Sequence, residues 1–168
     1  MATGQKKAIV RMLDDQRHWG YLPADGFLHQ DGVDLMAIDG RVIRIDLSDI
    51  QSIAYVKDFN TTDRTEPERL GKRLFQGRPR VPGLWLRLHF VDDDALEGMV
   101  EFDVALLDGV IADHGLTIAP PDGRGNTQRL FVPRHRLAAV EVLGWITTSA
   151  KPAPAPKRKP TDEQPALF

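Results

Sequence analysis

The chain has 168 residues, no cysteine, and a formal charge of −2 from 22 basic and 24 acidic side chains. This length fits one domain or two small ones, and a hydrophobic content of 42% is enough for a packed core. The lack of cysteine in the sequence excludes disulfides, a thiol nucleophile and thiolate metal sites. A charge near zero argues against a protein built around a general phosphate-binding surface.

Short runs of alternating apolar residues predict strands in the first part of the chain. We expect strands at 7–13, 19–22, 33–38, 41–46 and 51–56. Asp14-Asp15 predicts a turn between the first two, because aspartate tolerates a left-handed backbone and bonds to its own main chain. The polar stretch 47–50 predicts a single 3₁₀ turn before the last strand.

Residues 57–83 predict a connector that contains one short helix. Thr65-Glu66-Pro67-Glu68 has the spacing of a capping box with an early proline, so we expect a helix from 66 to 75. The glycines and prolines of 77–83 then predict an irregular end.

The pattern of the first part returns after the connector. Residues 10–15 align with 88–93 at an offset of 78, and residues 43–55 align with 130–142 at an offset of 87. We expect strands at 84–91, 95–100, 106–111, 115–119, 129–133 and 138–143. The sequence therefore predicts an internal repeat.

Five short strands with a 3₁₀ turn before the last are typical of a small SH3-like or Sm-like barrel. Closing the sheet lets about 60 residues form a core without an exposed edge. We predict a mainly β chain with two tandem small barrels (1–56 and 84–148), a connector with a short helix (57–83) and a disordered tail (149–168). One larger barrel or a split sandwich is the alternative.

Three segments support this architecture by resemblance: 42–59 (VIRIDLSDIQSIAYVKDF), 84–90 (LWLRLHF) and 125–134 (GNTQRLFVPR). With them, most of residues 7–145 resembles a group of uncharacterised bacterial proteins with small-barrel repeats. The resemblance implies a fold and no activity, so it carries no catalytic residue onto this chain.

The charge is unevenly divided along the chain. The four parts 1–56, 57–83, 84–148 and 149–168 carry −2, +3, −5 and +2. One hypothesis is therefore an Sm-like nucleic-acid-binding module that uses the basic residues of the connector and tail, namely Lys72, Arg73, Arg78, Arg80, Lys157, Arg158 and Lys159. The acidic charge of the two barrels opposes phosphate binding. In the alternative interpretation, the basic residues of the connector complement the acidic barrels within the same molecule.

The tail carries the sharpest functional signal. After a Pro/Ala-rich stretch, expected to be extended and structureless, the sequence ends Gln164-Pro165-Ala166-Leu167-Phe168. This ending resembles the Gln-x-x-Leu-Phe peptide by which bacterial replication and repair proteins dock on the DNA sliding clamp. Gln164, Leu167 and Phe168 would then bind a partner groove. Docking on another protein or on the chain's own barrels, and the absence of any role, are the alternatives.

No histidine pair has a metal-ligand spacing, and no serine lies in a nucleophile elbow. We therefore predict no catalytic residue, no metal site and no cofactor. The leading hypothesis is a non-enzymatic adaptor protein. The N-terminal residues lack the pattern of a signal peptide, and no window is apolar enough to span a bilayer. We accordingly expect a cytoplasmic protein with no membrane partner.

Overall fold

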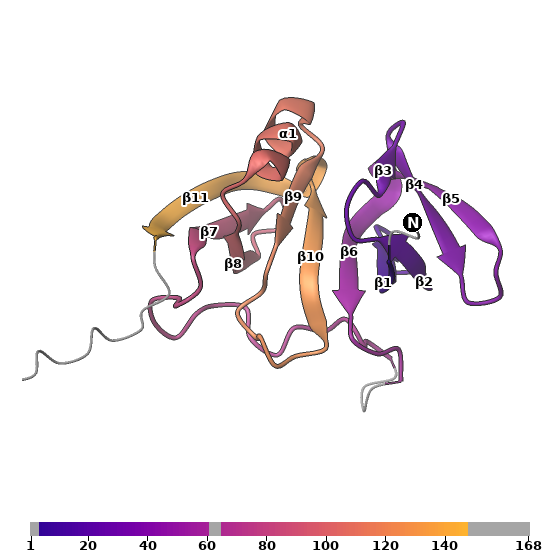
Figure 1. The fold of residues 1–168 in the computed structure, drawn as a ribbon, viewed down its shortest axis with the longest axis horizontal. Coiled ribbons are helices and arrows are strands. Elements are labelled where there is room, and N and C mark those ends of the chain that lie inside the picture. Colours follow the sequence, from indigo (N-terminus) through magenta and orange to yellow (C-terminus); the bar gives the residue numbers. More distant parts are fainter. Residues whose placement is uncertain (1–3, 61–64, 148–168) are drawn as a thin grey trace, which may run out of the picture.

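The computed structural model describes residues 4–60 and 65–147 of the chain (Figure 1). We call β1–β6 the first half, β7–β11 the second half, and the described residues between them the connector. The elements of the first half are β1 (Gln5–Met12), β2 (Arg17–Pro23), β3 (Leu28–His29), β4 (Gly32–Ala37), β5 (Val42–Asp46), the 3₁₀ turn η1 (Leu47–Asp49) and β6 (Ile50–Val56). Those of the second half are β7 (Gly83–Phe90), β8 (Ala95–Val100), helix α1 (Val104–Ala112), β9 (Gly115–Ile118), β10 (Thr127–Pro133), the 3₁₀ turn η2 (Arg134–Arg136) and β11 (Leu137–Ile146).

The described chain is mainly β, as predicted, and its strands pair antiparallel in two sheets. The eight-stranded sheet has the order β3-β4-β2-β1-β6-β10-β9, with β5 paired to β4. The three-stranded sheet has the order β11-β7-β8. A single bridge between Met99 and Ala119 links the end of β8 to the residue after β9. Apart from the two-residue β3, which pairs with β4, the strands therefore form one path, β5-β4-β2-β1-β6-β10-β9-β8-β7-β11, with β5 and β11 at its two ends.

The ladder between β1 and β6 recurs, pair by pair, between β7 and β11. Val10 lies opposite Ile53; Leu88, 78 residues after Val10, lies opposite Val140, 87 residues after Ile53. Both ladders shift register at the corresponding place, between Arg11 and Met12 in the first and between Leu137 and Ala139 in the second. The two halves therefore share one strand order, β6-β1-β2-β4-β5 and β11-β7-β8-β9-β10.

The turn after the first strand of each half also recurs. Asp15 and Asp93 both have a left-handed backbone, with φ angles of 65° and 67°. Each turn is closed by a backbone hydrogen bond of nearly the same length, 2.8 Å from Met12 N to Gln16 O and 2.9 Å from Phe90 N to Asp94 O. The di-acidic sequences place aspartate where the backbone needs a residue that tolerates positive φ.

The halves meet where β10 pairs with β6, and there they exchange core residues. Ile53 and Tyr55 of β6 lie in the core of the first half, together with Phe131 of β10. Ala54 and Val56 of the same strand lie in the core of the second half. Because β6 is buried on both faces, each half completes its core with side chains from the other.

The prediction of closed barrels is wrong. In the described residues β5 does not pair with β6, and β10 does not pair with β11, so neither half closes on itself. The edge of β6 that closure would use is taken by β10 of the other half. The sheet is continued across the two halves instead.

Two secondary-structure predictions are also wrong. The connector contains no helix over its described residues, and the segment predicted as a strand at 106–111 lies in helix α1. Asp103 caps α1, because its side chain accepts a hydrogen bond from the amide of Leu106 at 3.1 Å. Asp113, in the left-handed region at φ 55°, ends the helix.

The shared core makes a prediction about stability. Phe131 is 3% exposed, and its ring centroid lies 5.1 Å from that of Phe27 in the first half. We expect Phe131→Ala to lower the free energy of unfolding by about 3–5 kcal/mol, because it leaves a cavity at the junction. Urea denaturation followed by tryptophan fluorescence measures this. Leu107→Ala, at a 54% exposed position of α1, is the control and should stay within about 0.5 kcal/mol of the original. Equal losses of unfolding free energy in Phe131→Ala and Leu107→Ala would contradict the packing described for Phe131.

Candidate functional site

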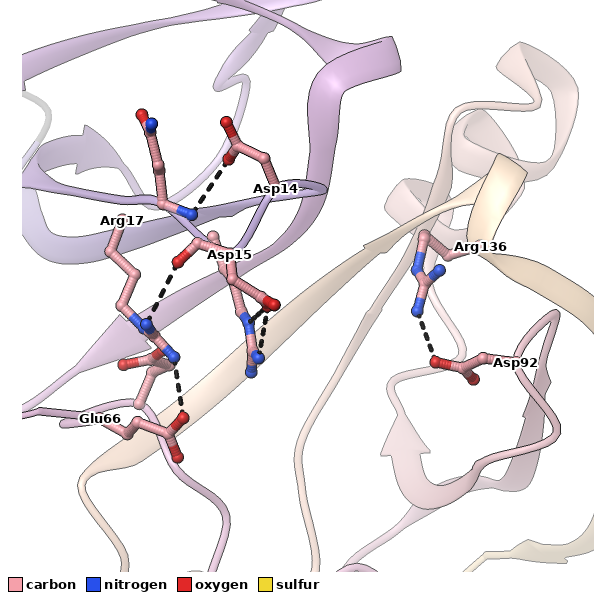
Figure 2. Close-up of polar contacts among 9 residues, drawn as sticks. Asp14, Asp15, Arg17, Glu66, Asp92 and Arg136 are labelled. Atoms are coloured by element: carbon pink, nitrogen blue, oxygen red, sulfur yellow. Dashed lines mark hydrogen bonds and ion pairs between the residues drawn. The ribbon is translucent and has the colours of Figure 1, made fainter.

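The main cluster of charged side chains lies where the connector crosses the two halves. Arg17 of β2 points toward the connector and bonds to two of its carboxylates (Figure 2). Its Nη2 lies 3.0 Å from Glu66 Oε1, and its Nε donates to Glu68 Oε1. The side chain of Glu68 is only 5% exposed and that of Arg17 16%. The hydrogen bond to Glu68 raises the pKa of Arg17 above its ordinary value, so the guanidinium stays charged.

The backbone of the connector is held from the second half. Asn126 Nδ2 donates to the carbonyl of Pro67 at 2.8 Å, and Thr127 Oγ1 donates to that of Glu68 at 3.0 Å. In a helix over 66–75 these carbonyls would accept from amides four residues later. Here they accept from side chains of the second half, and the described residues follow a non-helical path.

A second pair of charges lies on the other side of the cluster. Arg136 of η2 donates from Nη2 to Asp92 Oδ2 at 3.1 Å (Figure 2). This hydrogen bond lowers the pKa of Asp92 below its ordinary value. Next to it, Arg73 of the connector donates to Asp94 Oδ2 at 2.6 Å and to the carbonyl of Ala95 at 3.2 Å.

Most of these charged side chains, though not Arg17, line a cavity of about 470 Å³ between the connector and both halves. Two buried atoms of its lining, Glu68 Oε2 and Arg136 Nε, have no hydrogen-bond partner among the described residues. The charges of the lining balance, with four arginines and four carboxylates: Arg11, Arg69, Arg73, Arg136, Glu66, Glu68, Asp92 and Asp94. A neutral lining favours neither anions nor cations, so we interpret this cluster as the fastening of the connector.

The connector is fastened again at Glu97 of β8, whose side chain is 3% exposed. Its Oε1 accepts from Arg87 Nη2 at 2.8 Å, and its Oε2 accepts from the amide of Phe75 at 2.9 Å and from Trp85 Nε1 at 3.2 Å. Burial by itself raises the pKa of Glu97. The hydrogen bonds from Arg87, Phe75 and Trp85 outweigh burial, so the pKa lies below its ordinary value of 4.5.

The structure separates the basic residues predicted for nucleic-acid binding. Arg73 takes part in the fastening of the connector. Lys72, Arg78 and Arg80 are exposed and make no hydrogen bond or ion pair with the described residues. Lys157, Arg158 and Lys159 lie outside the described residues, as do Gln164, Leu167 and Phe168 of the predicted docking peptide.

The described residues contain no group of three His, Cys, Asp or Glu side chains that could hold a metal ion. No helix in the described ranges is long and apolar enough to cross a membrane.

Sequence reasoning missed the Arg17 cluster. Arg17 and Glu68 are 51 residues apart, and the local spacing around Glu66 favoured a capping box. No local signal in the sequence could have paired them, because the apolar residues Leu70, Leu74 and Phe75 follow a helical spacing.

The chain belongs to a family of unknown function (DUF6982), whose model matches residues 4–144. This range covers both halves, the connector and most of β11. Comparison with curated proteins and with solved structures found no match.

The fastening at Glu97 predicts a specific dependence on pH. Because its pKa is depressed in the folded protein, the carboxylate stabilises the fold above its ordinary pKa of 4.5. That stabilisation is lost as the pH falls through the folded value. We expect Glu97→Gln to lower the free energy of unfolding at neutral pH by about 1–3 kcal/mol, because Arg87 and two other donors lose a charged acceptor.

The same variant should lose less stability than the original protein between about pH 5 and pH 3, since it has no carboxylate to protonate at this position. Urea denaturation at a series of pH values measures both effects. The control is Glu101→Gln, at an exposed position just after the same strand. If the free energy of unfolding of Glu97→Gln falls with decreasing pH as steeply as that of the original protein, the role assigned to Glu97 is wrong.

Proposed function

We propose that this protein is a non-enzymatic interaction protein in which a β-rich body carries a peptide that docks on a groove of a partner. The observation that carries the proposal is the sequence Gln164-Pro165-Ala166-Leu167-Phe168, which has the Gln-x-x-Leu-Phe form of sliding-clamp-binding peptides. The partner proposed first is accordingly the bacterial DNA sliding clamp, and the compartment is the cytoplasm.

The chemistry of the peptide suits a groove with one polar and one apolar end. The amide of Gln164 can donate and accept at the polar end. Leu167 and Phe168 would each contribute roughly 1.5–3 kcal/mol on full burial, before the cost of ordering the peptide. A contact of this size gives a reversible interaction, as is typical of short linear peptides.

The placement of the last strand supports a tethered peptide. β11 ends at Ile146 on the side of the second half that faces away from the first half (Figure 1). Residues 149–168 add 20 residues, which span at most about 70 Å when fully extended. Lys157, Arg158 and Lys159 lie within this segment, and their charge favours encounter with an acidic rim or with DNA near the partner.

For the body, we infer two copies of one SH3-like or Sm-like five-strand unit, with the halves assigned to 1–56 and 84–148. The recurrence of the ladders, of the register shifts and of the aspartate turns supports this inference. Each copy is opened at the edge where the other joins it.

A nucleic-acid-binding role is the second candidate, and one observation favours it. Lys72, Arg78 and Arg80 are exposed connector residues without an ionic partner in the described part of the chain. They would be free to contact phosphates, and Lys157, Arg158 and Lys159 could add to them.

The docking proposal predicts loss of binding on truncation of the apolar pair. We expect Leu167→Ala with Phe168→Ala to weaken binding of the full chain to purified sliding clamp by at least about 100-fold, because two buried side chains are removed. Fluorescence anisotropy with labelled clamp measures this. Pro165→Ala, at a variable position of the peptide, is the matched control and should bind like the original. Binding that survives the double substitution, or that is absent from the original chain, would refute the proposal.

The second candidate is tested on the same preparations with single-stranded and double-stranded DNA and RNA at low salt. We expect affinity to fall with rising salt and to fall further in Lys72→Ala/Arg78→Ala/Arg80→Ala, because phosphate contacts release counterions. The control variant is Lys6→Ala/Arg41→Ala/Arg124→Ala, which removes three exposed charges outside the connector. No binding at low salt, or equal loss in both variants, removes this candidate.

A further inference from the structure

The two outer strands of the molecule are the counterparts of the two strands that join its halves. The halves are joined by β6 of the first and β10 of the second. β11 corresponds to β6, and β5 corresponds to β10, each at a distance of 87 residues along the chain. β5 and β11 are the ends of the strand path and lie at opposite sides of the molecule (Figure 1).

We propose that this chain associates with a second copy of itself through these edges: β11 of one copy pairs antiparallel with β5 of the next. The pairing would repeat the junction between β6 and β10. The two edges are too far apart in one molecule to meet each other, so the contact has to be made between molecules.

The register of the internal junction fixes the register between copies. Arg129 of β10 lies opposite Tyr55 of β6. The corresponding residues are Val42 of β5 and Val142 of β11, which would therefore lie opposite each other.

The exposure of these side chains supports the pairing. Tyr55 and Ile53 on β6 are 2% and 0% exposed, in the core of the first half that Phe131 of the second half completes. Val142 and Val140, their counterparts on β11, are 63% and 43% exposed, and Trp145 is 59% exposed. On the other edge, Val42 is 68% exposed, and Ile38, in the turn between β4 and β5, is 61% exposed. Val42 and Val142, which the register brings together, are thus both apolar and exposed.

The contact between copies should be weaker than the internal junction. Phe131, which fills the core of the first half, has Arg44 as its counterpart on β5, and Arg44 is bonded to Asp34 and to two carbonyls. On the outer face, the buried Ala54 of β6 has Glu141 as its counterpart on β11, and Glu141 pairs with Arg87. The proposed contact between copies therefore repeats the strand pairing and some apolar side chains of the internal junction. It does not repeat the buried core residues on the two faces of that junction. Association should therefore be reversible and depend on concentration.

The contact uses two different edges, so it is head to tail. Such an interface does not saturate in a dimer; it continues as an open chain of copies or closes into a ring. An assembly of this kind would carry one copy of residues 149–168 for each chain, which would raise the avidity for a partner with several grooves. The association itself does not depend on the docking function.

A cysteine crosslink tests the geometry directly, because the natural chain has no cysteine. Full-length Val42→Cys and Val142→Cys are mixed and oxidised mildly, and each is also oxidised alone. We expect the mixed product, with one chain of each variant, to exceed the crosslinked product of either variant alone, since facing cross-strand positions approach disulfide geometry. Crosslinks that form equally within each single variant would indicate a two-fold interface and overturn the proposal.

Sedimentation velocity over a concentration series tests the association without crosslinking. We expect the full chain to grow in size with concentration and Val142→Lys to stay monomeric, with Leu74→Lys, at an exposed position of the connector, as the control. The Leu167→Ala/Phe168→Ala chain should associate like the original, which separates this proposal from the docking function. A chain that is monomeric at all concentrations, or one that associates only when residues 149–168 are removed, overturns it.

Discussion

The structure depends on one strand that is buried on both faces. β6 ends the strand order of the first half, pairs with β1 on one side, and pairs with β10 of the second half on the other. Its odd-numbered residues Ile53 and Tyr55 face one core, and its even-numbered residues Ala54 and Val56 face the other. A strand that is covered on both faces and paired on both edges leaves neither half a complete core of its own. Folding of the two halves is therefore coupled, although each has its own complete set of strands.

The connector adds a second constraint, which is electrostatic. Arg17 holds Glu66 and Glu68 from the first half, while Arg73, Asn126 and Glu97 hold the connector to the second. The ion pairs contribute little net stability, because desolvation offsets the attraction of the largely buried pair Arg17–Glu68 and water screens the exposed pair Arg73–Asp94. Here the pairs determine one path for a segment that is rich in proline and glycine and has no regular structure of its own. We therefore assign the charged cluster to positioning rather than to chemistry.

Local features of the fold could be predicted from the sequence, whereas its closure could not. Alternating apolar residues and Asp-Asp turns locate most strands, because both signals act within a few residues. The run 106–111 was ambiguous, since a short apolar run fits a buried strand and a helix equally well, and only the cap at Asp103 separates them. The joining of the halves has a signal of its own in the sequence. Leu130-Phe131-Val132 and Ile53-Ala54-Tyr55-Val56 are unbroken apolar runs, which are typical of strands buried on both faces.

The division of charge bears on the kind of partner that the molecule can take. Residues 84–148 carry −5 and residues 1–56 carry −2, so the two halves would repel a phosphate backbone. Of the connector arginines, Arg73 is bonded to Asp94, and Arg69 lines the balanced cavity. Lys72, Arg78 and Arg80, the other connector residues predicted to bind nucleic acid, have no ionic partner among the described residues. Three exposed positive charges beside acidic surfaces attract nucleic acid only weakly, since each phosphate contact adds a modest, salt-dependent share of the affinity. An apolar pair such as Leu167 and Phe168 needs no favourable field and loses little with salt, which is why we propose a protein groove before nucleic acid as the partner.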